Sequence, residues 1–205
     1  QNIEYELVKS KNEWTQLIDS EIEFIKCQEE ISRLIFPGTF NPIHEGHLQI
    51  KEIAEKMTKQ KLFFEISVSN VDKAPLSYYE IQKTIEQFSK EHRWVLTNAP
   101  TFQEKIKLFP KSTFVVGTDT LMRIFDQKYY QDQLSMNKAL ECFDEYDARF
   151  IVFGREIEKT FRSLEDLQIP TSMLHRFEGV SENEFRMDIR SRDIKRSNEE
   201  SRRPA

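Results

Sequence analysis

The sequence predicts an α/β fold in which a parallel sheet of five or six strands is covered by helices on both faces. Strand-like and helical patterns alternate along most of the chain, which implies the crossover connections that join parallel strands. A length of 205 residues suits one domain, and 16 Phe and 6 Tyr supply large side chains for its core. We therefore expect ligands at the carboxyl ends of the strands, where the strand order reverses.

The predicted elements follow from hydrophobic spacing. A helical extension is expected over residues 1–32, with its clearest helical pattern at 12–33. The main domain is expected over 33–197 and a charged tail over 198–205. Apolar runs predict strands at 34–36, 62–69, 94–97, 113–116, 150–153 and 174–177. Helices are predicted at 45–60, 77–90, 101–108, 120–146 (broken near 129–130) and 188–197.

Composition narrows the function classes. A net charge of −5 gives no general reason to bind nucleic acid or an anionic membrane. No apolar run approaches the roughly 18 residues of a membrane span. The two cysteines are isolated, which suits a reducing compartment. We expect a cytoplasmic protein with small-molecule substrates and no nucleic-acid or membrane partner. A homo-oligomer stays open, as does organelle targeting, because the first residue is Gln1.

The glycine positions exclude several nucleotide-binding motifs. The chain contains no GxGxxG fingerprint and no GxxxxGK[ST] loop, and HExxH is also absent. The dinucleotide fingerprint, the Walker-type loop and the zincin helix are therefore excluded. The five glycines are Gly38, Gly46, Gly117, Gly154 and Gly179.

Residues 36–48, FPGTFNPIHEGHL, carry the clearest chemical signal. They predict a strand, a sharp turn and a helix start, whose free N–H groups and positive dipole end attract anions. His44 and His47 are three residues apart, so both imidazoles can donate to the same anion. A zinc site would need further ligands, and neither cysteine is near. A structural pair of histidines is the other alternative.

Residues 38–47, GTFNPIHEGH, resemble the GxFxPxHxGH signature of the nucleotidylyltransferase superfamily. The residues at these positions are most similar to those of nicotinamide and nicotinate mononucleotide adenylyltransferases. The resemblance implies a Rossmann-like fold, with backbone groups of Gly38, Thr39 and Phe40 lining the nucleotide. It implies catalytic contacts from both histidines to the ATP phosphates, and an acceptor contact from Asn41.

Residues 189–195, IRSRDIK, resemble a second motif of this superfamily, ISSTxxR. Ser191 and Lys195 match it, which implies contacts to the β- and γ-phosphates and a catalytic role for the lysine. Arg190 and Arg192 depart from the pattern, so hydroxyl contacts are lost and positive charge is gained. Arg192 is expected to contact ATP in place of the missing hydroxyl.

Further positions fit the same resemblance. Gly117 and Asp119 follow a predicted strand as the family's GxD does, where glycine admits the adenosine and aspartate meets its ribose. Lys73 resembles a lysine that approaches the acceptor phosphate, with a solvated loop lysine as the alternative. Trp94 is a candidate for stacking on a pyridine ring, and core packing is the alternative that we favour.

The resemblance implies transfer of AMP from ATP to nicotinamide mononucleotide, or to nicotinate mononucleotide, with release of pyrophosphate. Mg²⁺ would bind through the ATP phosphates, and no protein metal site is expected. Other nucleotidylyltransferase activities, with phosphopantetheine as acceptor or CTP as donor, are alternatives. The altered second motif also leaves open a nucleotide-sensing domain without turnover.

Overall fold

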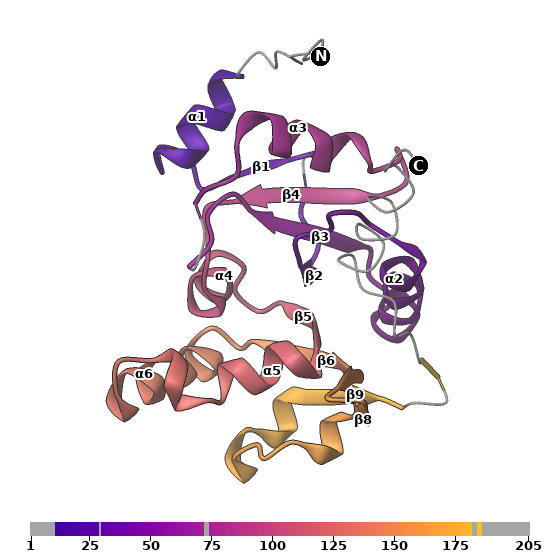
Figure 1. Ribbon diagram of the computed structural model, residues 1–205, viewed down its shortest axis with the longest axis vertical. Helices are drawn as coiled ribbons and strands as arrows, with labels where there is room; N and C mark the ends of the chain where they lie inside the picture. Colours follow the sequence, from indigo (N-terminus) through magenta and orange to yellow (C-terminus); the bar gives the residue numbers. More distant parts are fainter. Residues whose placement is uncertain (1–10, 29, 72–73, 182–183, 186–205) are drawn as a thin grey trace, which may run out of the picture.

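The computed structural model describes residues 11–28, 30–71, 74–181 and 184–185. Its centre is a seven-stranded sheet in the order β1-β4-β3-β2-β5-β6-β9 (Figure 1). Within this described part, six strands run parallel, as predicted, and β1 pairs antiparallel at one edge. The strands are β1 (Phe24–Lys26), β2 (Leu34–Pro37), β3 (Leu62–Ser67), β4 (Arg93–Thr97), β5 (Thr113–Gly117), β6 (Arg149–Phe153) and β9 (Phe177–Val180).

Helices cover both faces of the sheet (Figure 1). One core lies under α1 (Asn12–Ile18), α2 (Glu45–Thr58) and α3 (Tyr78–Glu86). The other lies under α4 (Phe102–Leu108), α5 (Thr118–Ile124) and α6 (Gln133–Glu145). Neighbouring strand residues alternate between the two cores, as Phe63 and Phe64 do, because successive side chains of a strand point to opposite faces.

The prediction of one helix over 12–33 is wrong. α1 ends at Ile18, Ser20 adopts a left-handed φ of 60°, and β1 then pairs with β4 so that Phe24 lies opposite Thr97. Helical spacing of apolar residues could not reveal this edge pairing, which buries Ile25 against a distant strand. Trp14 of α1 is 2% exposed in the first core. The described part of the extension therefore packs onto the sheet.

Two further differences lie in the last third of the chain. The strand predicted at 174–177 is shifted: Thr171–Arg176 forms the 3-10 helix η3, and β9 follows it. A hairpin of β7 (Arg155–Ile157) and β8 (Thr160–Arg162) was not predicted. Its turn residues Glu158 and Lys159 have φ of 51° and 65° without glycine or asparagine, so the sequence lacked the usual turn signal.

One other prediction in this region is confirmed, and one lies outside the described residues. The helical region 120–146 is interrupted, since the 3-10 helix η1 (Gln127–Tyr129) separates α5 from α6. A short 3-10 helix, η2 (Leu164–Asp166), follows the hairpin. The helix predicted at 188–197 lies outside the described residues. No helix in the described ranges combines the length and apolar character needed to cross a membrane.

The strand order places a ligand site. The chain moves from β2 through β3 to β4 on one side, and from β5 through β6 to β9 on the other. β2 and β5 are neighbours at the point where this direction reverses. Ligands of open parallel sheets bind beside the carboxyl ends of such strands. The residues after Pro37, Gly117 and Phe153 therefore border the position where a ligand is expected.

Candidate phosphate-binding site

The β2–α2 loop, residues 38–44, is shaped by an inward aromatic ring. Phe40 is 1% exposed and packs edge-on against Phe36 and Phe64, at centroid distances of 5.2 and 5.0 Å. A Cβ at Gly38 would lie 2.6 Å from the ring of Phe40, so this position requires glycine. The N–H of Gly38 donates to the carbonyl of Glu65 at 3.0 Å. The Phe40 ring and the Gly38 N–H thus hold the loop against the sheet. Thr39 is exposed.

His44 and His47 form a reciprocal cap at the start of α2. The N–H of Gly46 donates to Nδ1 of His44 at 3.1 Å, and the N–H of His44 donates to Nδ1 of His47 at 3.2 Å. The two rings stack with centroids 3.8 Å apart. Because each Nδ1 accepts a hydrogen bond, each neutral ring carries its proton on Nε2. The cap therefore presents two imidazole N–H donors side by side.

The cap favours the neutral form of both histidines. Burial lowers the pKa of His47 to about 3, with further lowering from His44 and from the positive charge of Arg155. Burial, and then Arg155, also lowers the pKa of His44. Protonation would additionally place a proton on a nitrogen that must accept a hydrogen bond. At neutral pH the histidines are thus neutral donors, and the nearby cation is Arg155.

Arg155 is a site residue that sequence reasoning missed. It is the first residue of β7 and follows β6 after Gly154, at the carboxyl edge of the sheet. A Cβ at Gly117 would lie 3.1 Å from Nε of Arg155, so the guanidinium side chain passes directly over the end of β5. The available signal was its position, because it directly follows a strand that ends at this edge. Alone, one arginine after a strand is not specific.

The predicted GxD turn lies beside this arginine. Gly117 is the N-cap of α5, and Asp119 is exposed in the first turn of that helix. A Cβ at Gly117 would also come too close to a carboxylate oxygen of Asp119, so the exposed Asp119 side chain would have to move if this residue were larger. Thr118 is buried, and its hydroxyl donates to the carbonyl of Arg162 at 3.1 Å, which ties the hairpin to α5. The ends of β2, β5 and β6 thus supply one group of residues.

A cleft of about 640 Å³ extends from Asp119 between α5, η1, the hairpin and η2. Ile157 and Arg162 line its hairpin wall. Arg155 pairs directly opposite Arg162 and lies two residues from Ile157, so the three side chains share one face of the hairpin. Tyr129 of η1 lines the opposite wall and is 53% exposed. The cleft therefore meets the group around the two histidines only through Asp119 and the hairpin face that carries Arg155.

The remaining predicted residues fall in three places. Asn41 is exposed in the β2–α2 loop. Trp94 lies near the amino end of β4 and packs against the first core. Its N–H donates to Sγ of Cys27 and its carbonyl accepts from the Cys27 N–H, so the structure does not bring it to the site. The other four residues, Lys73, Ser191, Arg192 and Lys195, lie outside the described residues.

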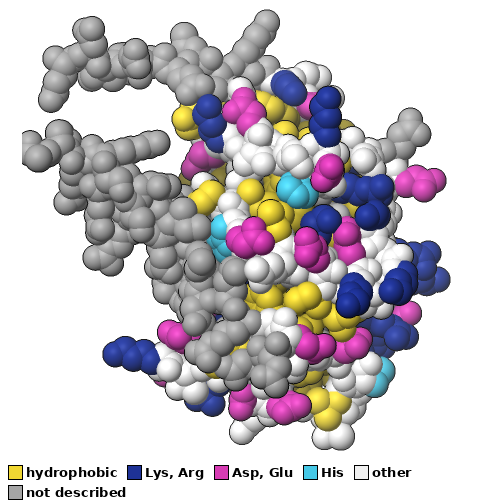
Figure 2. Space-filling view, turned by 90° about the vertical axis from the view of Figure 1, so that its right-hand side faces the viewer, with side chains coloured by type: hydrophobic (Ala, Val, Ile, Leu, Met, Phe, Trp, Pro, Cys, Tyr) yellow, Lys and Arg dark blue, Asp and Glu magenta, His cyan; other side chains and the backbone are white. Residues whose placement is uncertain are grey.

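The right-hand side of the molecule in Figure 1, where α2 lies, is chemically mixed. Figure 2 shows acidic, basic and histidine side chains close to one another among hydrophobic ones. Among the described residues, no group of three His, Cys, Asp or Glu side chains is placed to hold a metal ion. The donors at the site, imidazole N–H and guanidinium, suit phosphate oxygens rather than a cation.

Comparison with known proteins agrees with this chemistry. The family model described as "Cytidylyltransferase-like" matches residues 35–197. A Schizosaccharomyces pombe protein named "Putative nicotinamide mononucleotide adenylyltransferase" is 30% identical over 139 residues, which are 62% of this chain and 54% of the relative. The chain thus spans about half the length of that relative.

Proposed function

Because the chain belongs to the cytidylyltransferase-like family of nucleotidylyltransferases, we propose that it transfers AMP from ATP to a pyridine mononucleotide. Nicotinamide mononucleotide is the first choice and nicotinate mononucleotide the second. The observation that carries the proposal is the convergence of two neutral imidazole donors, Arg155 and the turn at Gly117 on one edge of the sheet. The name of the fission-yeast relative supports the choice of acceptor.

The proposed step is a direct displacement. An oxygen of the acceptor phosphate forms a bond to the α-phosphorus of ATP, the bond from that phosphorus to the bridging oxygen breaks, and pyrophosphate leaves with the electron pair. Nε2–H groups of His44 and His47 would donate to the phosphate oxygens, and Arg155 would offset their charge. Holding two phosphates in line suffices for such a transfer, so no protein nucleophile is required.

Mg²⁺, bound through the ATP phosphates, would neutralise further charge when present. The N–H groups around the histidines would contact the phosphates, and the phosphates of the nucleotide would hold the metal. We also propose that Ser191, Arg192 and Lys195 contact the β- and γ-phosphates and that Lys73 contacts the acceptor phosphate. These assignments rest on the motif resemblance.

The cleft beside Asp119 supports binding of a nucleoside. Its volume of about 640 Å³ lies in the usual range of small-molecule sites, and its walls combine aromatic, aliphatic and charged groups. Its hairpin wall includes Arg162, which pairs directly opposite Arg155. We propose that a nucleotide whose phosphates contact the two histidines places its ribose at Asp119 and its base in the cleft.

The direct test is a transfer assay. The purified protein would receive Mg-ATP or Mg-CTP with nicotinamide mononucleotide, nicotinate mononucleotide or phosphopantetheine, and pyrophosphate and products would be resolved chromatographically. We expect a dinucleotide from ATP and a pyridine mononucleotide. Turnover only with phosphopantetheine or only with CTP would refute the acceptor or the donor. Nucleotide binding without any turnover would favour the sensing domain.

A further inference from the structure

One side chain from another helix holds the β2–α2 loop. Gln87, at the end of α3, donates from Nε2 to the carbonyl of Phe40 and accepts at Oε1 from the N–H of Ile43 at 2.7 Å. A carboxamide offers a donor and an acceptor side by side. Gln87 thus gives this stretch of loop the two backbone bonds that a neighbouring strand would otherwise supply.

This clamp, in which the Gln87 side chain binds the backbone of Phe40 and Ile43, is itself held in place by its neighbours. Gln87 is the C-cap of α3, and its backbone N–H donates to the carbonyl of Ile85. The next residue, Phe88, stacks on Phe64 with centroids 5.2 Å apart and meets Phe40 edge-on at 6.3 Å. Helix and loop therefore pack on the same aromatic cluster. Because both partners are held by that cluster, the carboxamide can set the position of the loop.

The clamp ends directly before the histidine cap. Ile43 precedes His44, whose N–H donates to Nδ1 of His47 and whose ring accepts from Gly46. The orientation of the peptide unit between residues 43 and 44 therefore sets the bond from the His44 N–H to Nδ1 of His47. It also sets the direction in which the His44 side chain leaves the backbone. A loop displaced at Ile43 would turn the imidazoles away from a shared target.

We propose that Gln87 is a positioning residue for nucleotidyl transfer, which holds the β2–α2 loop so that His44 and His47 aim Nε2–H at the same phosphates. It acts through the backbone of Phe40 and Ile43. The inference rests on the proposed function for the identity of the substrate. The aim of the imidazoles is a property of the free protein and can be measured separately.

The test replaces Gln87 by methionine, which keeps the length and the unbranched shape of the side chain but removes both hydrogen bonds. Gln82→Met on the same helix is the matched control, because the Gln82 amide donates to Glu86 at 2.6 Å and lies outside the site. A misplacement near 1 Å can cost about a hundredfold in rate. We expect Gln87→Met to lower kcat roughly 10- to 100-fold with less than about a threefold change in the KM for ATP. Gln82→Met should change neither.

The second readout is the ¹⁵N signal of the imidazole rings in the free protein. We expect the wild-type protein and Gln82→Met to show the Nε2–H tautomer for both histidines, and Gln87→Met to show mixed tautomers for at least one. If Gln87→Met does not fold, Gln87→Glu takes its place, since a carboxylate still accepts from Ile43 but cannot donate to Phe40. We expect the same directions of change.

The two proposals fail in different ways. A wild-type protein without transfer activity would refute the proposed function alone, and the inference would then stand or fall on the imidazole signals. A folded variant at Gln87 with wild-type kcat and unchanged tautomers would overturn the inference, whatever the substrate. A general loss of stability would lower the apparent kcat through the active fraction and leave KM unchanged, so kcat is calculated per folded molecule. Such a loss would leave the imidazole tautomers of the folded protein as in the wild type.

Discussion

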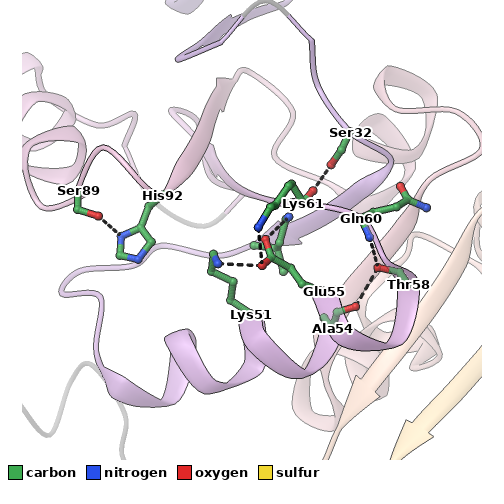
Figure 3. A network of polar contacts seen from close by, with 10 residues as sticks. Ser32, Lys51, Ala54, Glu55, Thr58, Gln60, Lys61, Ser89 and His92 are labelled. Atoms are coloured by element: carbon green, nitrogen blue, oxygen red, sulfur yellow. Dashed lines mark hydrogen bonds and ion pairs between the residues drawn. The ribbon is translucent and has the colours of Figure 1, made fainter.

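The two ends of α2 are stabilised in opposite ways. At the carboxyl-terminal end, Glu55 accepts from the N–H of Leu62 at 2.8 Å and lies 3.0 Å from Lys51 and 3.8 Å from Lys61 (Figure 3). Burial alone would raise the pKa of Glu55, but these partners hold it below its ordinary value. Every charge in this network is met by another group of the same network, and the helix is thereby tied to β3.

At the amino-terminal end, the polar groups are only half used. In each imidazole, Nδ1 accepts a hydrogen bond of the helix cap and Nε2–H is a donor. Arg155 adds a positive charge close by. Two half-buried histidines beside a cation lower the stability whenever they protonate. This cost at one end of the helix, against paired charges at the other, supports the proposal that the amino-terminal end binds an anionic ligand.

The largest expected effect is that of His47→Ala. A donor that strengthens its bond as charge develops acts mainly in the transition state, so kcat should fall by roughly 10²–10³ while ATP affinity changes much less. Steady-state kinetics and ATP binding by calorimetry would separate the two. The control is His175→Ala, on the exposed 3-10 helix η3. Equal losses in rate and affinity, or no loss, would return His47 to a structural role.

Arg155→Met tests the cation at the same end. Removing a guanidinium from a phosphate site weakens charge-assisted bonds, and we expect kcat/KM to fall about 10- to 100-fold. The pKa of His44 and of His47 should rise, because Arg155 contributes to the lowering of both after burial. NMR titration of the imidazoles would measure that change without substrate. Imidazole titrations that match the wild type would mean that Arg155 does not face the cap.

The sequence predicted that His44 and His47 lie together, but it did not predict the groups that reach them from distant parts of the chain. The spacing of His44 and His47 after a strand and a turn predicted a shared anion site, because local geometry fixes it. Arg155 and Gln87 reach the site through a hairpin and a helix from distant parts of the chain, and nothing local distinguishes them. The edge strand β1 was missed for the same reason, since its pairing with β4 decides its conformation.

Acid should destabilise the protein through the histidine cap. The folded state holds the pKa of His47 near 3 against an ordinary value of 6.5, so between these pH values the unfolded chain binds more protons. Stability from this source is complete above about pH 6.5 and declines as the pH falls toward 3. From pH 7.5 to pH 5 we expect a loss on the order of 1 kcal/mol, since solvent reaches part of the ring.

Urea unfolding at the two pH values measures this loss. His47→Asn should remove much of the difference between them, because asparagine can still accept from the N–H of His44 but does not titrate. His175→Asn should leave the difference as it is. A wild-type protein equally stable at pH 5 and 7.5 would contradict the buried, neutral cap.

The smallest effect is expected at the other end of α2, from Glu55→Gln. The amide oxygen can still accept from the N–H of Leu62, so the change removes charge and leaves the connection to β3. Glu55 and Lys51 are each 16% exposed, which makes their ion pair stronger than a fully solvated one but still screened. We expect the free energy of unfolding to fall by about 0.5–1 kcal/mol with no change in kcat.

A double-mutant cycle with Lys51→Met, measured by urea unfolding at low and high salt, would isolate the pair, and its coupling should shrink as salt rises. A loss of transfer activity in Glu55→Gln at full stability would show that the two ends of α2 are coupled, and the division of labour along this helix would be wrong.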